Sequence, residues 1–258
     1  MSYWKDRAAK SMDKLTGKTQ RAIEMRLRKY YRDAATRAIE DFEATYNKLL
    51  ATVAEGRQPT PADLYKLDKY WQAQAQLREE LRKLGEKQVV ELTKQFERNW
   101  FDIYYSINLG DTTPYATIDS ATVQQMLEAI WCADGKSWSK RIWENTNRLM
   151  ETLNDGLIHC VTTGKKPSEL KKVLQNRFNV SYSRADALVR TELAHIQTQA
   201  AEQRYKDYGI EFVEIWADED ERRCEVCGKL HQKKYKVGDP LPIPAHTNCR
   251  CCIVPVVE

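Results

Sequence analysis

The sequence contains little glycine and little proline, with ten and eight residues among 258. An all-β sandwich or barrel, which turns about every ten residues, normally needs more of both. No run approaches the ~20 consecutive apolar residues of a membrane span, and the first residues, MSYWKDRAAK, lack the apolar stretch of a secretory signal. The mean hydropathy is −0.68. These absences predict a soluble, mainly α-helical protein that stays in the compartment where it is made.

The usual catalytic motifs are also missing. The chain has no G-x-S-x-G, phosphate-binding loop or dinucleotide fingerprint, and it lacks the H-x-E and P-C-x-x-C signature of zinc deaminases. His159 and Cys160 are neighbours on an expected helix, where successive side chains point about 100° apart, so they cannot form a simple dyad. We therefore expect no enzymatic activity.

The positive charge is concentrated at one end of the chain. The net charge is only +4, yet residues 1–32 hold ten basic and three acidic side chains. A basic end on a nearly neutral body favours contact with an acidic protein face, a lipid surface or DNA, whereas a solvated helix face is the simpler alternative. The candidate contact residues are Lys10, Lys14, Lys18, Arg21 and Arg28.

Apolar residues recur at steps of three and four from Ile23 to Val53, which predicts one long helix. After a break at 56–59, Thr60 resembles an N-cap, with Pro61 in the first turn and Asp63 completing a capping box. Two more helices are expected, over about 64–84 and 89–107, separated near a glycine at position 85. Residues 1–114 thus read as an elongated helical bundle.

Shorter elements follow a linker at 111–115. Helices are expected near 120–132, 137–163 and 168–178, and Ser183 with Asp186 predicts a second capping box that opens a helix to about Asp207. Residues 210–217 and 251–257 read as strands, and Pro255 places the second strand at a sheet edge. The fold class is mainly α, with a small α+β domain at 115–258 that carries a Cys/His cluster at 224–252.

Five of the seven cysteines lie in the last 35 residues. Cys224 and Cys227 are two residues apart, and His246 and Cys249 repeat that spacing, which suits tetrahedral zinc. Cys251 is the alternative fourth ligand, and His231 could substitute for one. We predict a structural zinc ion held by Cys224, Cys227, His246 and Cys249. Reduced core thiols and disulfides remain as alternatives.

The order of motifs in the second half resembles phage head-morphogenesis proteins of the family named after the F protein of phage Mu. The resemblance covers about 120–258 and is carried by these residues: Arg190, Thr191, Glu192, Gly209, Trp216, Asp220, Cys224, Cys227, Leu230, the block from His246 to Cys251 that includes Arg250, and Pro255. It implies a minor head protein of the virion, assembled in the host cytoplasm in several copies and located near the portal and the capsid interior. The implied partners are the portal protein, the major capsid protein and packaged double-stranded DNA, with roles in head morphogenesis, DNA packaging or ejection. The half at 1–114 looks like a region that docks on the portal or capsid.

The Arg190-Thr191-Glu192 motif is expected to be structural. Residues two apart on a helix do not face each other, so Arg190 and Glu192 cannot form a surface pair. We expect one of them to hold the cysteine-rich loops through buried hydrogen bonds; a catalytic carboxylate and solvated charges are the alternatives. Two other functions stay open: a zinc-stabilised nucleic-acid-binding module, and an effector enzyme, because modules of this family are also joined to toxin domains.

Overall fold

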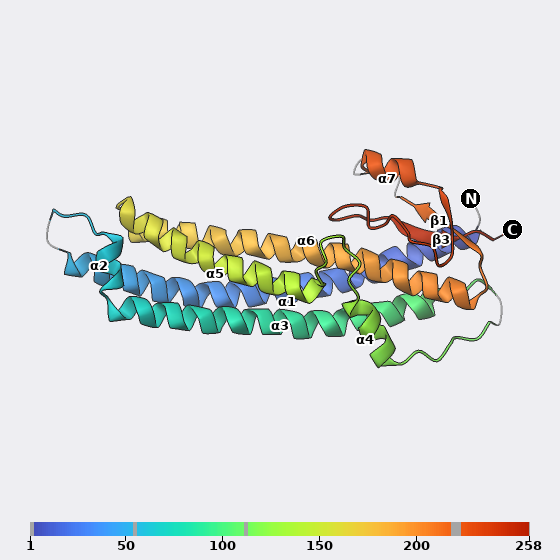
Figure 1. The fold of residues 1–258 in the computed structure, drawn as a ribbon, viewed down its shortest axis with the longest axis horizontal. Helices are drawn as coiled ribbons and strands as arrows, with labels where there is room; N and C mark the ends of the chain where they lie inside the picture. Colours follow the sequence, from blue (N-terminus) through green and yellow to red (C-terminus); the bar gives the residue numbers. More distant parts are fainter. Residues whose placement is uncertain (1–2, 54–55, 111–112, 218–222, 258) are drawn as a thin grey trace. The chain divides into compact units, whose positions relative to one another are not determined.

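The computed structural model describes residues 3–53, 56–110, 113–217 and 223–257. Over these residues the chain is mainly helical with one small sheet, as predicted (Figure 1). The helices are α1 (Tyr3–Thr52), α2 (Pro61–Tyr65), α3 (Asp68–Ser106), α4 (Ser120–Glu128), α5 (Trp138–Thr162), α6 (Pro167–Asp207) and α7 (Glu225–Leu230). The strands are β1 (Phe212–Trp216), β2 (Lys234–Lys236) and β3 (Cys252–Pro255). Among the described residues, no helix is both long and apolar enough to cross a membrane.

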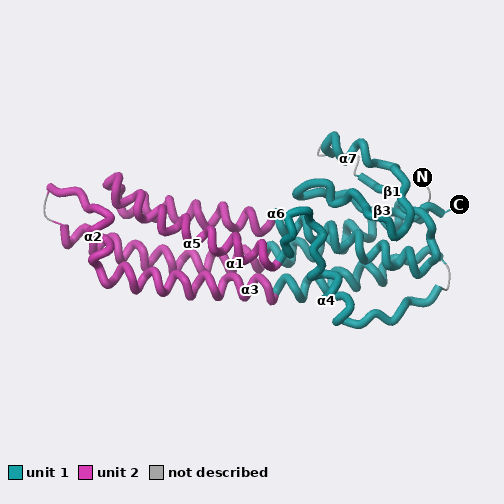
Figure 2. The backbone as a smooth tube through the Cα atoms, in the orientation of Figure 1, with its two compact units in different colours: residues 1–24, 91–138, 187–258 teal, residues 25–90, 139–186 magenta. Residues whose placement is uncertain are grey.

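The chain forms two compact units that alternate along the sequence (Figure 2). Unit 1 comprises residues 1–24, 91–138 and 187–258, and unit 2 comprises 25–90 and 139–186. The domain boundary expected between residues 114 and 115 stays a prediction.

Unit 2 is a bundle of helices whose buried polar groups connect neighbouring helices. The Tyr46 hydroxyl on α1 donates to the carbonyls of Cys160 and Lys165, at 3.2 and 2.6 Å. On α5, Asn154 Oδ1 accepts hydrogen bonds from Tyr70 and Gln74 of α3. The apolar stripe predicted from Ile23 to Val53 supplies much of this core, since its members Leu27, Tyr31, Phe42 and Leu49 are buried.

The predicted capping box at Thr60 is confirmed, but the helices around it differ from expectation. The Thr60 side chain accepts from the Asp63 N–H, and the Asp63 carboxylate accepts from the Thr60 N–H. The helix that it starts, α2, ends at Tyr65. The separate helices expected before and after Gly85 are wrong, because α3 runs through this glycine without a break. A Cβ at Gly85 would lie 2.4 Å from the Trp143 ring, so the glycine permits close packing of α3 on α5.

The second predicted capping box, at Ser183 and Asp186, is wrong. Ser183 lies inside α6, and its hydroxyl donates to the Asn179 carbonyl at 2.9 Å, one helical turn back. This bond is the way a serine is tolerated in a helix interior, and a sequence pattern cannot distinguish it from a cap. The helix expected at 168–178 and the one expected to end at Asp207 are therefore the single helix α6.

In unit 1 the small sheet is antiparallel, with strand order β2-β1-β3. Val213 of the central strand pairs with Tyr235 on one side and Pro255 on the other. Pro255 therefore lies on an edge strand, as its missing N–H requires. Strand β2 and helix α7 are elements that the sequence pattern does not predict. On the helical side, the Tyr205 hydroxyl of α6 donates to the Ile253 carbonyl at 3.3 Å, which joins α6 to β3.

A buried arginine holds the segment after α3 against α6. Arg204 is 1% exposed, and its guanidinium donates to the carbonyls of Thr113 and Pro114, both at 3.0 Å. Its Cζ lies 3.9 Å from the ring centre of Tyr115 and 4.0 Å from that of Tyr208. The described part of the expected linker is therefore fixed within unit 1.

Candidate metal centre

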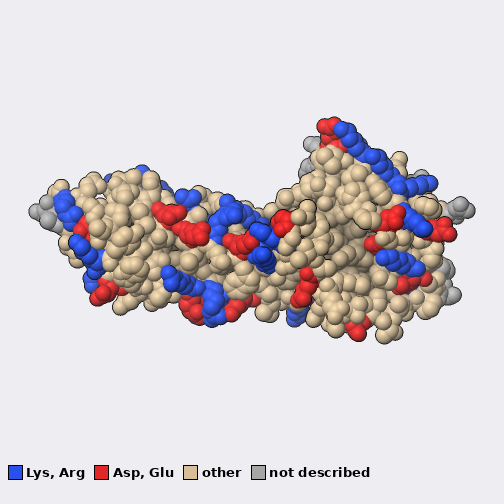
Figure 3. Space-filling model, viewed as in Figure 1, with Lys and Arg blue, Asp and Glu red and all other residues tan. Residues whose placement is uncertain are grey.

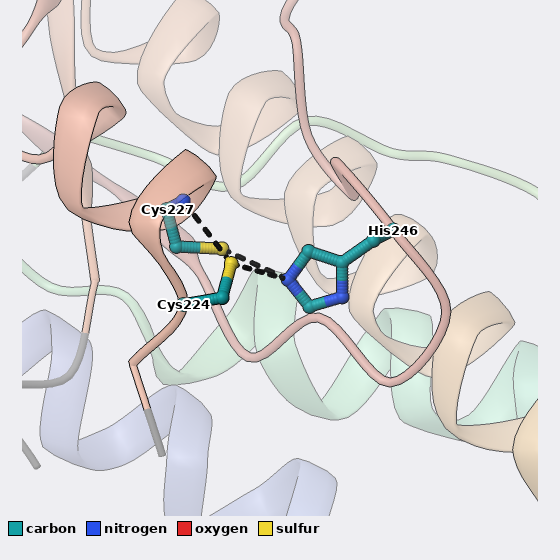
Figure 4. Close-up of side chains that lie close together, drawn as sticks. All are labelled: Cys224, Cys227 and His246. Carbon is teal, nitrogen blue, oxygen red and sulfur yellow. Dashed lines mark hydrogen bonds between the residues drawn. The ribbon is translucent and has the colours of Figure 1, made fainter. Parts of the chain in front are cut away.

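The first two sulfur atoms lie at the start of α7. Cys224 is the N-cap of this helix, and its Sγ accepts a hydrogen bond from the Cys227 N–H at 3.3 Å. A side chain at the N-cap folds back toward the first turn to accept such a bond. The two-residue spacing therefore brings the two thiols together, and both point toward His246 (Figure 4).

The imidazole of His246 meets both thiols. Its Nε2 lies 3.2 Å from Cys224 Sγ and 3.1 Å from Cys227 Sγ. Sulfur and nitrogen ligands on a tetrahedral zinc ion lie about 3.6 Å apart, given Zn–S and Zn–N bonds of about 2.3 and 2.05 Å. A shift of a few tenths of an ångström would therefore place these three atoms around one ion.

A backbone carbonyl fixes the protonation of His246. Nδ1 lies 2.8 Å from the Thr247 oxygen. A carbonyl can only accept, so Nδ1 carries a proton, and the neutral ring then has its lone pair on Nε2, on the side of the thiols. The same hydrogen bond raises the pKa of His246. Metal-binding histidines commonly have such a partner on the second nitrogen.

A second group of three sulfur atoms shares Cys227. The ligand atoms of Cys227, Cys249 and Cys251 lie within 4.8 Å of one another, as do those of Cys224, Cys227 and His246. The Sγ atoms of Cys227 and Cys249 are 3.8 Å apart. Two sulfur ligands of a tetrahedral zinc ion with Zn–S bonds of about 2.3 Å are separated by the same distance. The structure thus gathers all five predicted ligand residues into two overlapping groups of three.

The space between these residues suits a single ion. A cavity of about 30 Å³ is lined by Cys224, Cys227, His246 and Cys251, among others, and a cavity of this size holds about one water molecule. A sulfur-rich set with one imidazole suits zinc, whereas magnesium and calcium prefer oxygen ligands. The donor set and the space therefore fit zinc. Cys249 and Cys251 both remain candidates for the fourth ligand.

The thiols differ in their electrostatic surroundings. A hydrogen bond from Cys251 lowers the pKa of Cys249 to about 5, and the pKa of Cys251 is raised by the same bond. Burial raises the pKa of Cys227 to about 12. None of the seven cysteines, all of which lie in the described residues, forms a disulfide in the structure.

Thr191 connects α6 to the cysteine-rich segment. Its Oγ1 accepts a hydrogen bond from the Asn248 N–H at 3.1 Å and donates to the Ala187 carbonyl. Glu192 is buried and accepts from Trp131 Nε1 at 3.0 Å. The expected contact of Arg190 or Glu192 with the cysteine-rich loops stays a prediction. The contact described here comes from Thr191, the middle residue of the same predicted motif.

Of the other motif residues, Trp216 and Arg250 are described. Trp216 ends β1, and its ring centre lies 4.8 Å from that of His231, whose Nδ1 accepts the Ala217 N–H. His231 belongs to neither of the two groups found among the described residues. Arg250 lines the small cavity. Asp220 lies outside the described residues.

The five predicted basic contact residues are all exposed on α1. Lys10, Lys14, Lys18 and Arg21 follow one another at steps of three and four, so they share a helix face within unit 1. In unit 2, the Arg28 guanidinium lies 5.1 Å from the centre of the Tyr182 ring.

A second basic surface was missed. Figure 3 shows a row of Lys and Arg side chains over the part of unit 1 that Figure 1 labels α7. Lys229, Lys233, Lys234 and Lys236 of this region are exposed. The K-K-Y-K run at 233–236 was the sequence signal that could have found it.

Comparison with known proteins identifies the region that contains the cluster. Residues 151–254 match the family model described as phage Mu protein F like protein. Residues 151–254 are similar to the Mu F-like family. The match includes Arg190-Thr191-Glu192 and both cysteine pairs, so the resemblance predicted from these motifs is confirmed.

A second similarity concerns part of a longer protein. The chain is 23% identical over 187 residues to a protein named NAD(+)--arginine ADP-ribosyltransferase EFV, from Enterococcus faecalis. The alignment covers 64% of this chain and 38% of that relative, so the chain spans well under half of the relative's length. No solved structure matches the chain.

Proposed function

We propose that this chain is a minor head protein of a phage, located near the portal and the inner face of the capsid. The Mu F-like match over residues 151–254 carries the proposal, because that family is one of phage head-related proteins. The proposed partners are the portal protein and the major capsid protein, and the proposed roles are head morphogenesis and DNA packaging or ejection. Residues 1–114 are proposed to dock on the portal or capsid.

In this proposal the metal is structural zinc, held by Cys224, Cys227, His246 and Cys249, with Cys251 as the alternative fourth ligand. Four protein ligands leave no open position for a reacting water. The ion would join α7 to the segment before β3. That segment is also bonded to α6 through Thr191 and Asn248. Together these links support a rigid surface that a partner in the head could recognise.

The composition of purified virions tests the head role. Mass spectrometry of particles of the phage that encodes this chain should find it in several copies, and it should co-sediment with purified portal protein. Particles that lack the chain, combined with no co-sedimentation, would contradict the proposal.

A nucleic-acid-binding module is the second candidate, and the exposed basic face of α1 favours it. Four phosphate contacts predict that affinity for a DNA duplex falls about a hundredfold between about 50 and 200 mM salt. Replacing Lys10, Lys14, Lys18 and Arg21 by glutamine should abolish filter retention of the duplex. If filter retention of the duplex changes neither with salt nor with these substitutions, then α1 is not the DNA contact. DNA binding without any place in the virion would favour this module over a head protein.

An enzymatic role is proposed to be absent, although the similar Enterococcus faecalis protein is named as an ADP-ribosyltransferase. The shared segment is 38% of that protein, and the buried Glu192 is already bonded to Trp131. Incubation of the chain with NAD⁺ and an arginine acceptor should release no nicotinamide above a heat-denatured control. If the unmodified chain releases nicotinamide and the Glu192→Gln variant does not, then Glu192 is a catalytic carboxylate.

A further inference from the structure

The two outer edges of the small sheet differ in their surroundings. In the described part of the chain the strand order is β2-β1-β3, so β2 and β3 are the edge strands. Along β3, the Tyr205 hydroxyl of α6 donates to the Ile253 carbonyl at 3.3 Å, so this edge is bonded to a helix. Along β2, Lys234 and Lys236 are exposed and Tyr235 between them is half-buried. Of the two edges, β2 is therefore the one that a partner can reach.

The pairing with β1 shows which backbone groups of β2 point outward. The Val237 N–H donates to the Glu211 carbonyl at 2.9 Å, so the backbone of Val237 faces the side of β1. Backbone groups alternate in direction along a strand, and those of Lys236 and Lys234 therefore point away from β1. The Lys236 carbonyl accepts the Asp239 N–H at 3.1 Å, in the turn that follows β2. Two N–H groups and the Lys234 carbonyl thus have the directions that an added strand uses.

The two lysines of β2 share one face of the sheet. In the register of β1 and β2, Lys234 pairs with Glu214 and Lys236 pairs with Phe212. The buried Glu214 carboxylate forms its ion pair with Lys5 of α1, at 2.7 Å, so its charge is compensated from that helix. Residues two apart on a strand are separated by about 6.6 Å. Positive charge is therefore repeated along the exposed edge at this interval.

This repeat matches the carboxylates of an extended acidic segment. On an antiparallel strand added to β2, the residues opposite Lys234 and Lys236 are two apart and lie on the same face. The residue between them lies opposite Tyr235, on the other face. A segment with the order acidic, apolar, acidic therefore places both carboxylates at the ammonium groups and its middle side chain at the tyrosine. Lysines on an edge strand disfavour pairing with neutral or basic strands, so the same charges also provide selectivity.

A nucleic acid is the other anionic partner that exposed lysines attract. Its phosphate oxygens only accept hydrogen bonds, whereas the outward groups of β2 include a carbonyl, which needs a donor. A peptide backbone supplies both donors and acceptors. Phosphates would also use Lys229 and Lys233, which are exposed outside β2, as readily as the two lysines on the strand. The outward backbone groups therefore favour a peptide.

We propose that β2 binds an extended acidic segment of a partner protein as a fourth strand of the sheet, with alternating carboxylates at Lys234 and Lys236. The added strand leaves the pairing of β2 with β1 unchanged. The proposal concerns this edge alone and stands whether or not the chain is a head protein.

The test is a titration of the full chain with a capped synthetic peptide that contains Glu-Val-Glu-Val-Glu. The comparison peptide has the same composition with its glutamates adjacent, so it carries the same charge without the alternation. The test variant is Lys234→Gln/Lys236→Gln. The matched control is Lys229→Gln/Lys233→Gln, which removes the same charge from exposed positions outside β2. Circular dichroism should show that both variants are folded.

The alternating peptide should bind the unmodified chain and the control within about twofold of each other, and the test variant about tenfold more weakly. It should also bind the unmodified chain more tightly than the comparison peptide does. Hydrogen exchange followed by NMR should show slower exchange of the Lys234 and Lys236 amides in its presence, because their N–H groups become bonded.

Three results would overturn the proposal: no binding of the alternating peptide, equal binding of the two peptides, or unchanged exchange of the two amides. Equal weakening by the test variant and the control would also overturn it, since the surface would then attract anions without strand pairing. A short DNA duplex that binds and is weakened equally by both variants, when the peptide does not bind, would assign the surface to a nucleic acid instead.

Discussion

Lys5 Nζ lies 2.7 Å from Glu214 Oε2, and the pair joins the first turns of α1 to the central strand of the sheet. The Lys5 side chain is 18% exposed and that of Glu214 is 7% exposed. Residues 1–24 of the basic end thus belong to the same unit as the cysteine-rich segment. One of its ten basic side chains neutralises a buried carboxylate and is not available to an acidic partner.

Removing this ion pair should destabilise unit 1. Lys5→Ala leaves the Glu214 carboxylate buried without its partner, which is expected to cost about 3 kcal/mol. Lys10→Ala is the matched control, because Lys10 is exposed on the same helix, and its cost should stay within about 0.5 kcal/mol. Urea unfolding measures both. Equal stability of the two variants would contradict the structural role of Lys5.

The two helical glycines Gly17 and Gly85 should respond in opposite directions to alanine. Gly17→Ala should stabilise the protein by about 0.5–1 kcal/mol, since alanine favours helix and the added Cβ would make only an ordinary contact, at 3.6 Å, with the end of the Arg21 side chain. Gly85→Ala should destabilise it by about 1–3 kcal/mol, because the Cβ would lie 2.4 Å from the Trp143 ring.

Thermal unfolding of the two glycine variants gives the comparison directly. If Gly85→Ala were as stable as Gly17→Ala, then Trp143 would be able to move aside. Close packing would then not explain why α3 contains a glycine.

His195 should make stability depend on pH. Burial lowers the pKa of His195 to about 4, and its ring stacks on Trp131 at 4.3 Å. An unfolded histidine has a pKa near 6.5, so the unfolded state takes up the proton first as the pH falls. Stability should therefore decrease between about pH 6.5 and 4, by up to about 1.4 kcal/mol per pH unit.

The variant His195→Phe keeps an aromatic ring beside Trp131 and removes the titration. Its free energy of unfolding should fall less steeply over this pH range than that of the unmodified chain. His159→Phe, a change of the exposed histidine on α5, should leave the slope unchanged. Parallel slopes for all three proteins would show that His195 is not buried as described.

The sequence predicted the parts of this structure that depend on local signals. The Thr60 capping box and the close approach of Cys224, Cys227 and His246 follow from spacing alone. The helix through Gly85 did not, because the reason for the glycine is a tryptophan 58 positions away in the chain. The Lys5–Glu214 pair joins residues even farther apart, and no pattern within either segment indicates the other.

Spacing and geometry leave two candidates for the fourth metal ligand, Cys249 and Cys251. Cys249 repeats the two-residue spacing from His246, and we expect Cys249→Ser to lose zinc. Cys251→Ser should keep the ion with about 10- to 100-fold weaker affinity, because Cys251 hydrogen-bonds to Cys249. Zinc titration with a competing chelator measures both. The reverse result would make Cys251 the ligand and Cys249 its hydrogen-bond partner.

The zinc content and coordination of the purified full chain test the metal centre most directly. Elemental analysis should give close to one zinc ion per chain, and X-ray absorption should show three sulfur ligands at about 2.3 Å and one nitrogen at about 2.0 Å. Cys224→Ser should lose this signal and destabilise the cysteine-rich part of unit 1, while the long helices persist. A chain without metal, in which all seven cysteines react with a thiol reagent in the native state, would contradict the account.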